Sequence, residues 1–192
     1  SHIFDEVSSL CRESDNIVIP IPLNHRAHPS NYNLSGIYIL LLNNMQKYYI
    51  PINHSEALMN FDFGKIHSLI SNMNDIYVID SKEFKHIFGS VNVHDCNALS
   101  YHIYGKPLEK LTTSAHEQVY STHWKRENLN GIVPILKHLE YCDNMSTNMI
   151  DVIDNSVISS KAYQKFNKTL LNNLFEIERS GLNTTEGLKG CY

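Results

Sequence analysis

The sequence predicts an α/β fold in which a mixed β-sheet is flanked by helices. Short β-branched runs come first, at residues 17–23, 37–42 and 48–51, and polar residues bound each of them. From residue 63 onward, segments with helical periodicity alternate with further short apolar runs. Strands that first follow one another and then alternate with helices are typical of a mixed sheet with helices on its faces.

Composition limits the class of protein. The 192 residues are 42% hydrophobic, which is enough to bury the core of one domain with an appendage. A formal net charge of -4 argues against broad electrostatic attraction to nucleic acid. Four scattered cysteines without a CxxC pair indicate free thiols in a reducing compartment. Because the chain also lacks a membrane-spanning run and a signal pattern, we expect a cytoplasmic protein.

Apolar spacing predicts the elements of the N-terminal part. A turn containing Asn43 and Asn44 is expected to join two strands into a hairpin. The expected elements are helix 3–10, strand 17–23, strands 37–42 and 48–51, helix 63–73, strand 76–79 and helix 81–88.

The C-terminal part is expected to be mostly helical. Asp95 is placed to cap a helix, and Gly181 is placed to stop the last one. A Ser/Asn-rich stretch, 155–161, is expected to separate two long helices. The expected elements are a strand over residues 91–93, a helix over 96–104 and long helices over 129–153 and 162–179.

Three local patterns occur in the order found in one known family. Residues 49–54 resemble that family's hairpin ending in Tyr-Ile-Pro-x-x-His, and residues 93–103 resemble its Phe-Asp-Thr helix start. Residues 170–182 form an apolar segment ending Ile-Glu-x-x-Gly, which is similar to the helix that opens a polymerase domain. On these motifs the chain resembles the 3′–5′ proofreading exonuclease domain of bacterial DNA polymerase I, a family A polymerase.

The resemblance implies a fold of the ribonuclease H-like, DEDD exonuclease type. It implies a degenerate 3′–5′ exonuclease-like domain over residues 1–160 and the truncated start of a polymerase domain over 161–192. We therefore expect a fragment of a longer, monomeric polypeptide. Its partner would be the polymerase domain of the same chain, and it would meet DNA only through the full-length protein, with no membrane contact.

The family's catalytic carboxylates are missing from the matching positions. An active member holds two Mg²⁺ ions with four carboxylates and also uses a tyrosine. Its Asp-x-Glu positions correspond here to Pro20 and Pro22, its next aspartate to Lys85, and its Tyr-x-x-x-Asp motif to Tyr141 and Met145. Since these replacements cannot form a Mg²⁺ site, we expect no metal cofactor and no proofreading activity.

The two prolines carry a structural expectation as well. Pro20 and Pro22 alternate along their strand, so both are expected on one side of it. Proline cannot complete a β-ladder, so this strand is expected to be irregular or to lie beside an open groove. The leading hypothesis is a catalytically inactive domain that supports a polymerase in DNA replication or repair.

Two alternatives to this hypothesis remain open. One is an active metal-dependent 3′–5′ exonuclease that uses Mg²⁺ and displaced carboxylates, namely Asp80, Glu83, Asp95 and Asp143. The other is a non-cleaving module for single-stranded DNA, with contacts from Arg26, Lys82, Lys85, Trp124, Lys125 and Arg126. His25, His28 and His86 would complete its basic rim. An ordinary solvated surface, with Trp124 packed between helices, explains the same residues.

Overall fold

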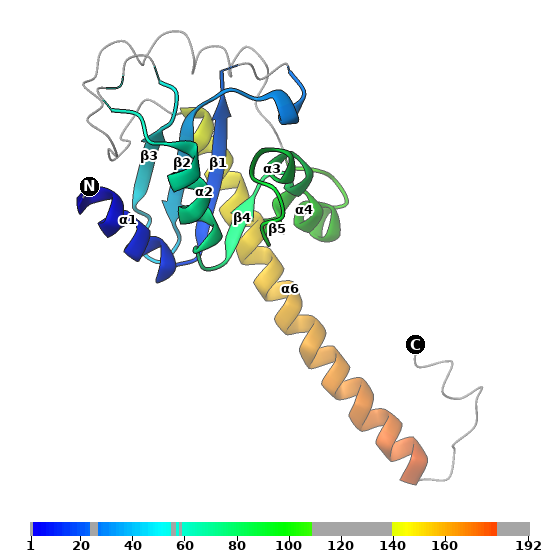
Figure 1. Ribbon diagram of the computed structural model, residues 1–192. Coiled ribbons are helices and arrows are strands. Elements are labelled where there is room, and N and C mark those ends of the chain that lie inside the picture. Colours follow the sequence, from blue (N-terminus) through cyan, green and yellow to red (C-terminus); the bar gives the residue numbers. More distant parts are fainter. Residues whose placement is uncertain (1, 24–26, 55–56, 58, 109–139, 180–192) are drawn as a thin grey trace. The chain divides into compact units, whose positions relative to one another are not determined.

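The structure is a computed structural model that describes residues 2–23, 27–54, 57, 59–108 and 140–179. The chain divides into two compact units, Ser1–Val152 and Ile153–Tyr192, and the boundary falls inside a helix. The first unit is a five-stranded mixed sheet flanked by helices, which confirms the predicted α/β class (Figure 1).

The elements follow one another in the order expected for the N-terminal part. They are α1 (His2–Arg12), β1 (Asn16–Pro22), the 3-10 helix η1 (Pro29–Asn31), β2 (Leu34–Leu41), β3 (Lys47–Pro51), α2 (Phe63–Ser71), β4 (Ile76–Val78), α3 (Ser81–Phe88), β5 (His94–Asp95), α4 (Cys96–Tyr104) and α6 (Glu140–Arg179).

The sheet has the strand order β3-β2-β1-β4-β5. Strands β1, β2 and β3 pair antiparallel, whereas β4 and β5 run parallel to β1. In the antiparallel part Ile19 lies opposite Tyr38, and Tyr38 lies opposite Tyr49. Because directly opposite residues of a ladder share one face, these pairings assign each side chain of β1 to a face of the sheet.

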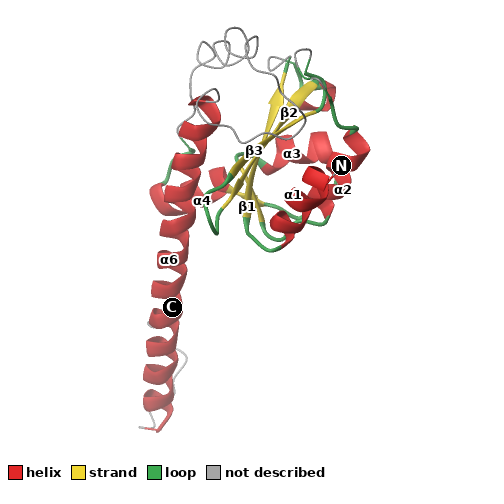
Figure 2. Ribbon diagram, turned by 90° about the vertical axis from the view of Figure 1, so that its left-hand side faces the viewer, coloured by secondary structure: helices red, strands yellow, loops and turns green. Residues whose placement is uncertain are grey.

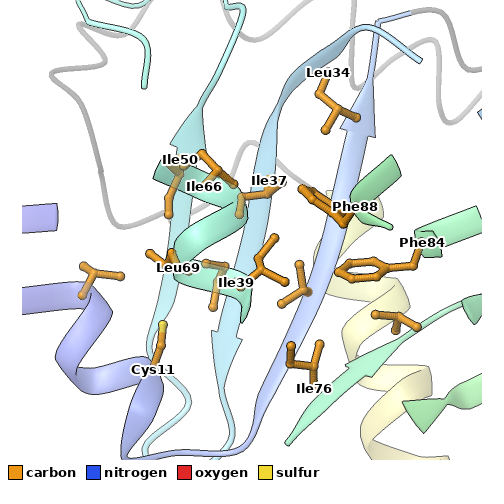
Figure 3. Close-up of a cluster of buried hydrophobic side chains, with 14 of the residues drawn as sticks. Cys11, Leu34, Ile37, Ile39, Ile50, Ile66, Leu69, Ile76, Phe84 and Phe88 are labelled. Carbon is orange, nitrogen blue, oxygen red and sulfur yellow. The ribbon is translucent and has the colours of Figure 1, made fainter. Parts of the chain in front are cut away.

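Helices α1, α2 and α3 cover one face of the sheet. Their buried side chains include Cys11, Ile66 and Phe84, which pack against Ile37 and Ile50 of the sheet (Figure 3). In α2 the buried residues recur at the spacing of an amphipathic helix, as predicted. The first turns of α6 lie on the other face, so the sheet is buried from both sides (Figure 2).

Strand β1 accommodates both prolines at its irregular end. Its parallel pairing with β4 covers only Asn16 and Ile17, so β1 has no β4 partner at Pro20. The register with β2 then shifts between Ile21 and Pro22. A proline is tolerated where a neighbouring ladder has ended or a bulge interrupts it. The expectation of an irregular strand is therefore confirmed.

One local expectation was wrong. The strand expected at residues 91–93 lies at His94–Asp95, because the Val91 amide still donates to the Gly89 carbonyl (2.9 Å) and the chain is turning there. Val91 and Val93 pack against the core without joining the sheet. The predicted hairpin is confirmed: the turn that contains Asn43 and Asn44 joins β2 to β3, and its left-handed residue is Met45 (φ 62°).

Helix α6 is continuous where a separating stretch was expected. It runs unbroken from Glu140 to Arg179, through residues 155–161. Ser156 Oγ donates to the Ile153 carbonyl (2.7 Å), so the helix itself satisfies this polar side chain. Residues 129–139 and Gly181 lie outside the described residues. Within the described part of the chain, no helix has the length and apolar character needed to cross a membrane.

Gly36 is required by the close approach of β2 to β3. A Cβ atom there would lie 2.5 Å from the Ile50 carbonyl oxygen and 2.5 Å from the Tyr49 ring. We predict that Gly36→Ala lowers the free energy of unfolding by about 1–3 kcal/mol, since backbone and buried ring must both move. Gly64→Ala, in helix α2, is the control and is expected to be neutral or stabilising. Urea unfolding measures both; equal effects would contradict the packing described.

Candidate functional site

The first turns of α6 cover one side of the sheet (Figure 2). The α6 residues that contact this side are buried, with exposed fractions of 0% for Cys142, Met145 and Met149 and 8% for Tyr141. Two hydroxyl contacts, from Tyr38 to Asp143 (3.2 Å) and to Ser146 (3.4 Å), join the sheet to the helix. The region is therefore a packed contact rather than an open cleft.

The predicted site positions do not all come together. Pro20 lies opposite Ile37, and Pro22 lies opposite Leu34. Ile37 and Leu34 both belong to the core under α1, α2 and α3, so the two prolines share one side, as predicted. That side is the one turned away from α6. Tyr141 and Met145 therefore lie across the sheet from Pro20 and Pro22.

The α6 side of β1 is occupied by isoleucines instead. Ile19 lies opposite Tyr38, whose hydroxyl contacts α6, and Ile17 and Ile21 alternate onto the same side. Both faces of β1 thus lack an ionisable side chain, because the strand reads Asn-Ile-Val-Ile-Pro-Ile-Pro. Whichever alternate set is matched to the family's Asp-x-Glu, β1 supplies no carboxylate.

On α3 the residue near Tyr141 is Glu83 rather than Lys85. Burial is the main cause that raises the pKa of Tyr141 and of Tyr32, and the nearby Glu83 carboxyl group adds to both shifts. Lys85 is exposed, and two residues of helix separate it from Glu83 by more than half a turn. Lys85 therefore lies on a different side of α3 from the residue that approaches α6.

Tyr141 is a packed, neutral phenol. Burial is the main cause that raises its pKa above the ordinary value, and Cys142, Glu83 and Tyr32 add to it. Burial likewise raises the pKa of the fully buried Cys142 thiol well above its usual range. Neither group ionises near neutral pH, so neither supplies an anionic ligand for a metal.

Asp143 forms an ion pair with the sheet. Lys47 Nζ on β3 donates to Asp143 Oδ1 (2.8 Å), and the Tyr38 hydroxyl donates to the same oxygen. The pair is partly buried, with about a quarter of the Asp143 side chain exposed (26%). Sequence reasoning missed Lys47, because nothing in the local pattern signals a partner 96 residues away.

Asp80 and Asp95 cap helices. Asp80 Oδ1 accepts from the amides of Lys82 (2.9 Å) and Glu83 (3.3 Å) at the start of α3. Asp95 Oδ1 accepts from the Ala98 amide (2.9 Å), and this confirms the predicted cap of α4. Its Oδ2 accepts from the amide and hydroxyl of Ser81, at 2.8 Å each. These hydrogen bonds hold both carboxylates at helix ends.

Metal-ligating side chains do not gather in the described ranges. Among these residues, no group of three or more His, Cys, Asp or Glu side chains is placed to hold a metal ion. The displaced carboxylates of the active-enzyme alternative lie at the start of α3 (Asp80 and Glu83), at the β5–α4 junction (Asp95) and in α6 (Asp143).

Two histidines of the predicted basic rim are in contact. The His28 and His86 rings meet edge to face with centroids 4.8 Å apart, which brings the loop before η1 against α3. Lys82 and Lys85 are exposed on that helix. The other predicted contacts, His25, Arg26, Trp124, Lys125 and Arg126, lie outside the described residues.

Comparisons with known proteins gave no family. No protein-family model matches this chain, and no curated protein matches it.

The ion pair of Asp143 can be tested by a double-mutant cycle. Asp143→Ala is predicted to lower the free energy of unfolding by about 1–2 kcal/mol, because it removes the partner of Lys47 and a hydrogen bond from Tyr38. Lys47→Met should cost less, and the double variant less than the sum of both. Glu13→Ala, an exposed acidic residue, is the control for charge and should have little effect. Strictly additive effects would show that the two residues do not interact.

Proposed function

We propose that the chain is a structural, catalytically inactive domain of the ribonuclease H-like exonuclease kind, from a cytoplasmic family A DNA polymerase. Three antiparallel strands followed by two parallel strands, with helices on both faces, support this assignment. The role would be to support the adjoining polymerase domain in replication or repair, and residues 161–192 would begin that domain. A shared fold alone does not imply a shared activity.

One observation supports the proposed lack of nuclease activity. Strand β1, which supplies the first two carboxylates in the family, offers no oxygen ligand from a carboxylate on either face. Mg²⁺ in such sites is held chiefly by carboxylates, and the metal ions provide most of the charge stabilisation during phosphodiester hydrolysis. Without them the remaining tyrosine, Tyr141, has no reacting group to assist.

The surrounding contacts also support a structural role. Met145, at the family's last aspartate position, is fully buried (0% exposed). A carboxylate buried there without a cation would be strongly destabilising, so the present contact favours packing over chemistry. The nearby acidic residues Asp80, Asp95 and Asp143 cap helices or pair with Lys47.

The absence of nuclease activity is tested on the chain itself. A 3′-labelled single-stranded oligonucleotide should remain intact in the presence of the protein and Mn²⁺ or Mg²⁺. Asp143→Ala and Glu83→Ala should leave that result unchanged. Metal-dependent shortening that either substitution abolishes would overturn the proposal in favour of an active enzyme with displaced carboxylates.

The contact between His28 and His86 favours a second candidate, the non-cleaving module for single-stranded DNA. In that case the chain would bind a single-stranded oligonucleotide with an affinity that falls steeply as the salt concentration rises. Lys82→Ala or Lys85→Ala would weaken this binding. A structural domain binds no oligonucleotide at physiological salt, and the same two variants change nothing. The binding assay therefore separates the two functions.

A further inference from the structure

A groove of about 270 Å³ lies between α4 and the first turns of α6. Leu108 and Val152 are nearly fully buried beneath it, while Tyr104 and Lys106 lie at its exposed rim. Asp151 of α6 completes the rim. The groove thus combines an apolar floor with a flat aromatic ring and charged side chains, and it is separate from the family's site positions on β1 and α3.

The walls of the groove are held by specific hydrogen bonds. Gly105 ends α4 in the left-handed conformation (φ 70°), which turns the chain back along the helix. Ser100 Oγ donates to the Lys106 carbonyl (2.8 Å), and Asn97 Oδ1 accepts from the Leu108 amide (3.0 Å). Residues 106–108 are therefore fixed against α4, and Lys106 projects from an ordered segment.

Tyr104 connects the two helices across the groove. Its hydroxyl donates to Asp151 Oδ2 (2.9 Å), and the rest of the side chain is 46% exposed. The hydrogen bond orients the ring while leaving much of its surface accessible. A preformed ring of this kind can stack on a planar ligand at a small cost in conformational entropy.

We propose that this groove binds a nucleoside monophosphate. The base would stack on Tyr104 above the apolar floor, and the phosphate would contact Lys106, the one cationic side chain in the described lining. The volume is at the small end for ligand pockets, which favours a single nucleotide over a longer strand. Because the lining holds one cationic side chain, Lys106, and one carboxylate, Asp151, it suits one phosphate better than a triphosphate. The inference goes beyond the structural role proposed above and does not depend on it.

The test is a titration of the full 192-residue chain, followed through the NMR amide signals of Lys106, Leu108 and Thr147. The probes are adenosine 5′-monophosphate, adenosine and inorganic phosphate. The monophosphate should shift these signals with an affinity about tenfold above that of adenosine, since the ion pair with Lys106 adds to stacking. Phosphate alone should shift them little.

Variants assign each part of the ligand to its side chain. Lys106→Gln should weaken monophosphate binding to the level of adenosine and leave adenosine binding unchanged. Tyr104→Leu should weaken both ligands by about tenfold, and Tyr104→Phe, which keeps the ring, should retain most of the affinity. Lys65→Gln, an exposed lysine on α2, is the control and should bind as the unmodified chain does.

Two results would overturn the proposal. One is the absence of signal changes in the groove at millimolar monophosphate. The other is binding that Lys106→Gln and Tyr104→Leu leave intact, which would place the nucleotide elsewhere. Because Lys106 is exposed, its substitution does not threaten the fold, and nuclease activity has no part in the readout.

Discussion

The contact between the first turns of α6 and the sheet is the interaction on which the first unit depends. Helices α1, α2 and α3 cover only one face of the strands, so the isoleucines of β1 on the other face would be exposed without α6. Cys142, Met145 and Met149 are completely buried by this contact. Burial of apolar area stabilises the fold by about 25 cal/mol per Å². The ion pair between Lys47 and Asp143 lies beside this apolar contact and orients the helix on the sheet.

The same contact supports the proposed lack of nuclease chemistry. A two-metal site needs several carboxylates and access for water and substrate. Here the strand contributes isoleucine and the helix contributes methionine, and burial holds the Tyr141 phenol in its neutral form. Tyr141 is therefore a packing residue in this contact. Asp80 and Asp95 cap helices and Asp143 pairs with Lys47, so the negative charge of these three residues has a structural use.

Sequence patterns predicted those features of the fold that depend on residues close together in the chain. The amphipathic helix α2, predicted from its apolar spacing, and the helix cap formed by Asp95 are both confirmed. The position of β5 was wrong, because apolar alternation at Val91 and Val93 also suits a segment that packs on the core without pairing. The face occupied by Pro20 was not predictable, since it depends on its pairing with a strand that is distant in sequence. Lys47 and Asp143 were not paired in advance for the same reason.

We expect the packed contact between β1 and α6 to hold no divalent metal. Paramagnetic broadening by Mn²⁺ in the NMR spectrum of the labelled chain tests it most directly, since broadening reports proximity to the ion without requiring catalysis. We predict no selective broadening of the amide signals of residues 16–22 and 141–149 at micromolar Mn²⁺. Selective loss of those signals, reversed by a chelator, would contradict it and reveal a metal site in the first unit.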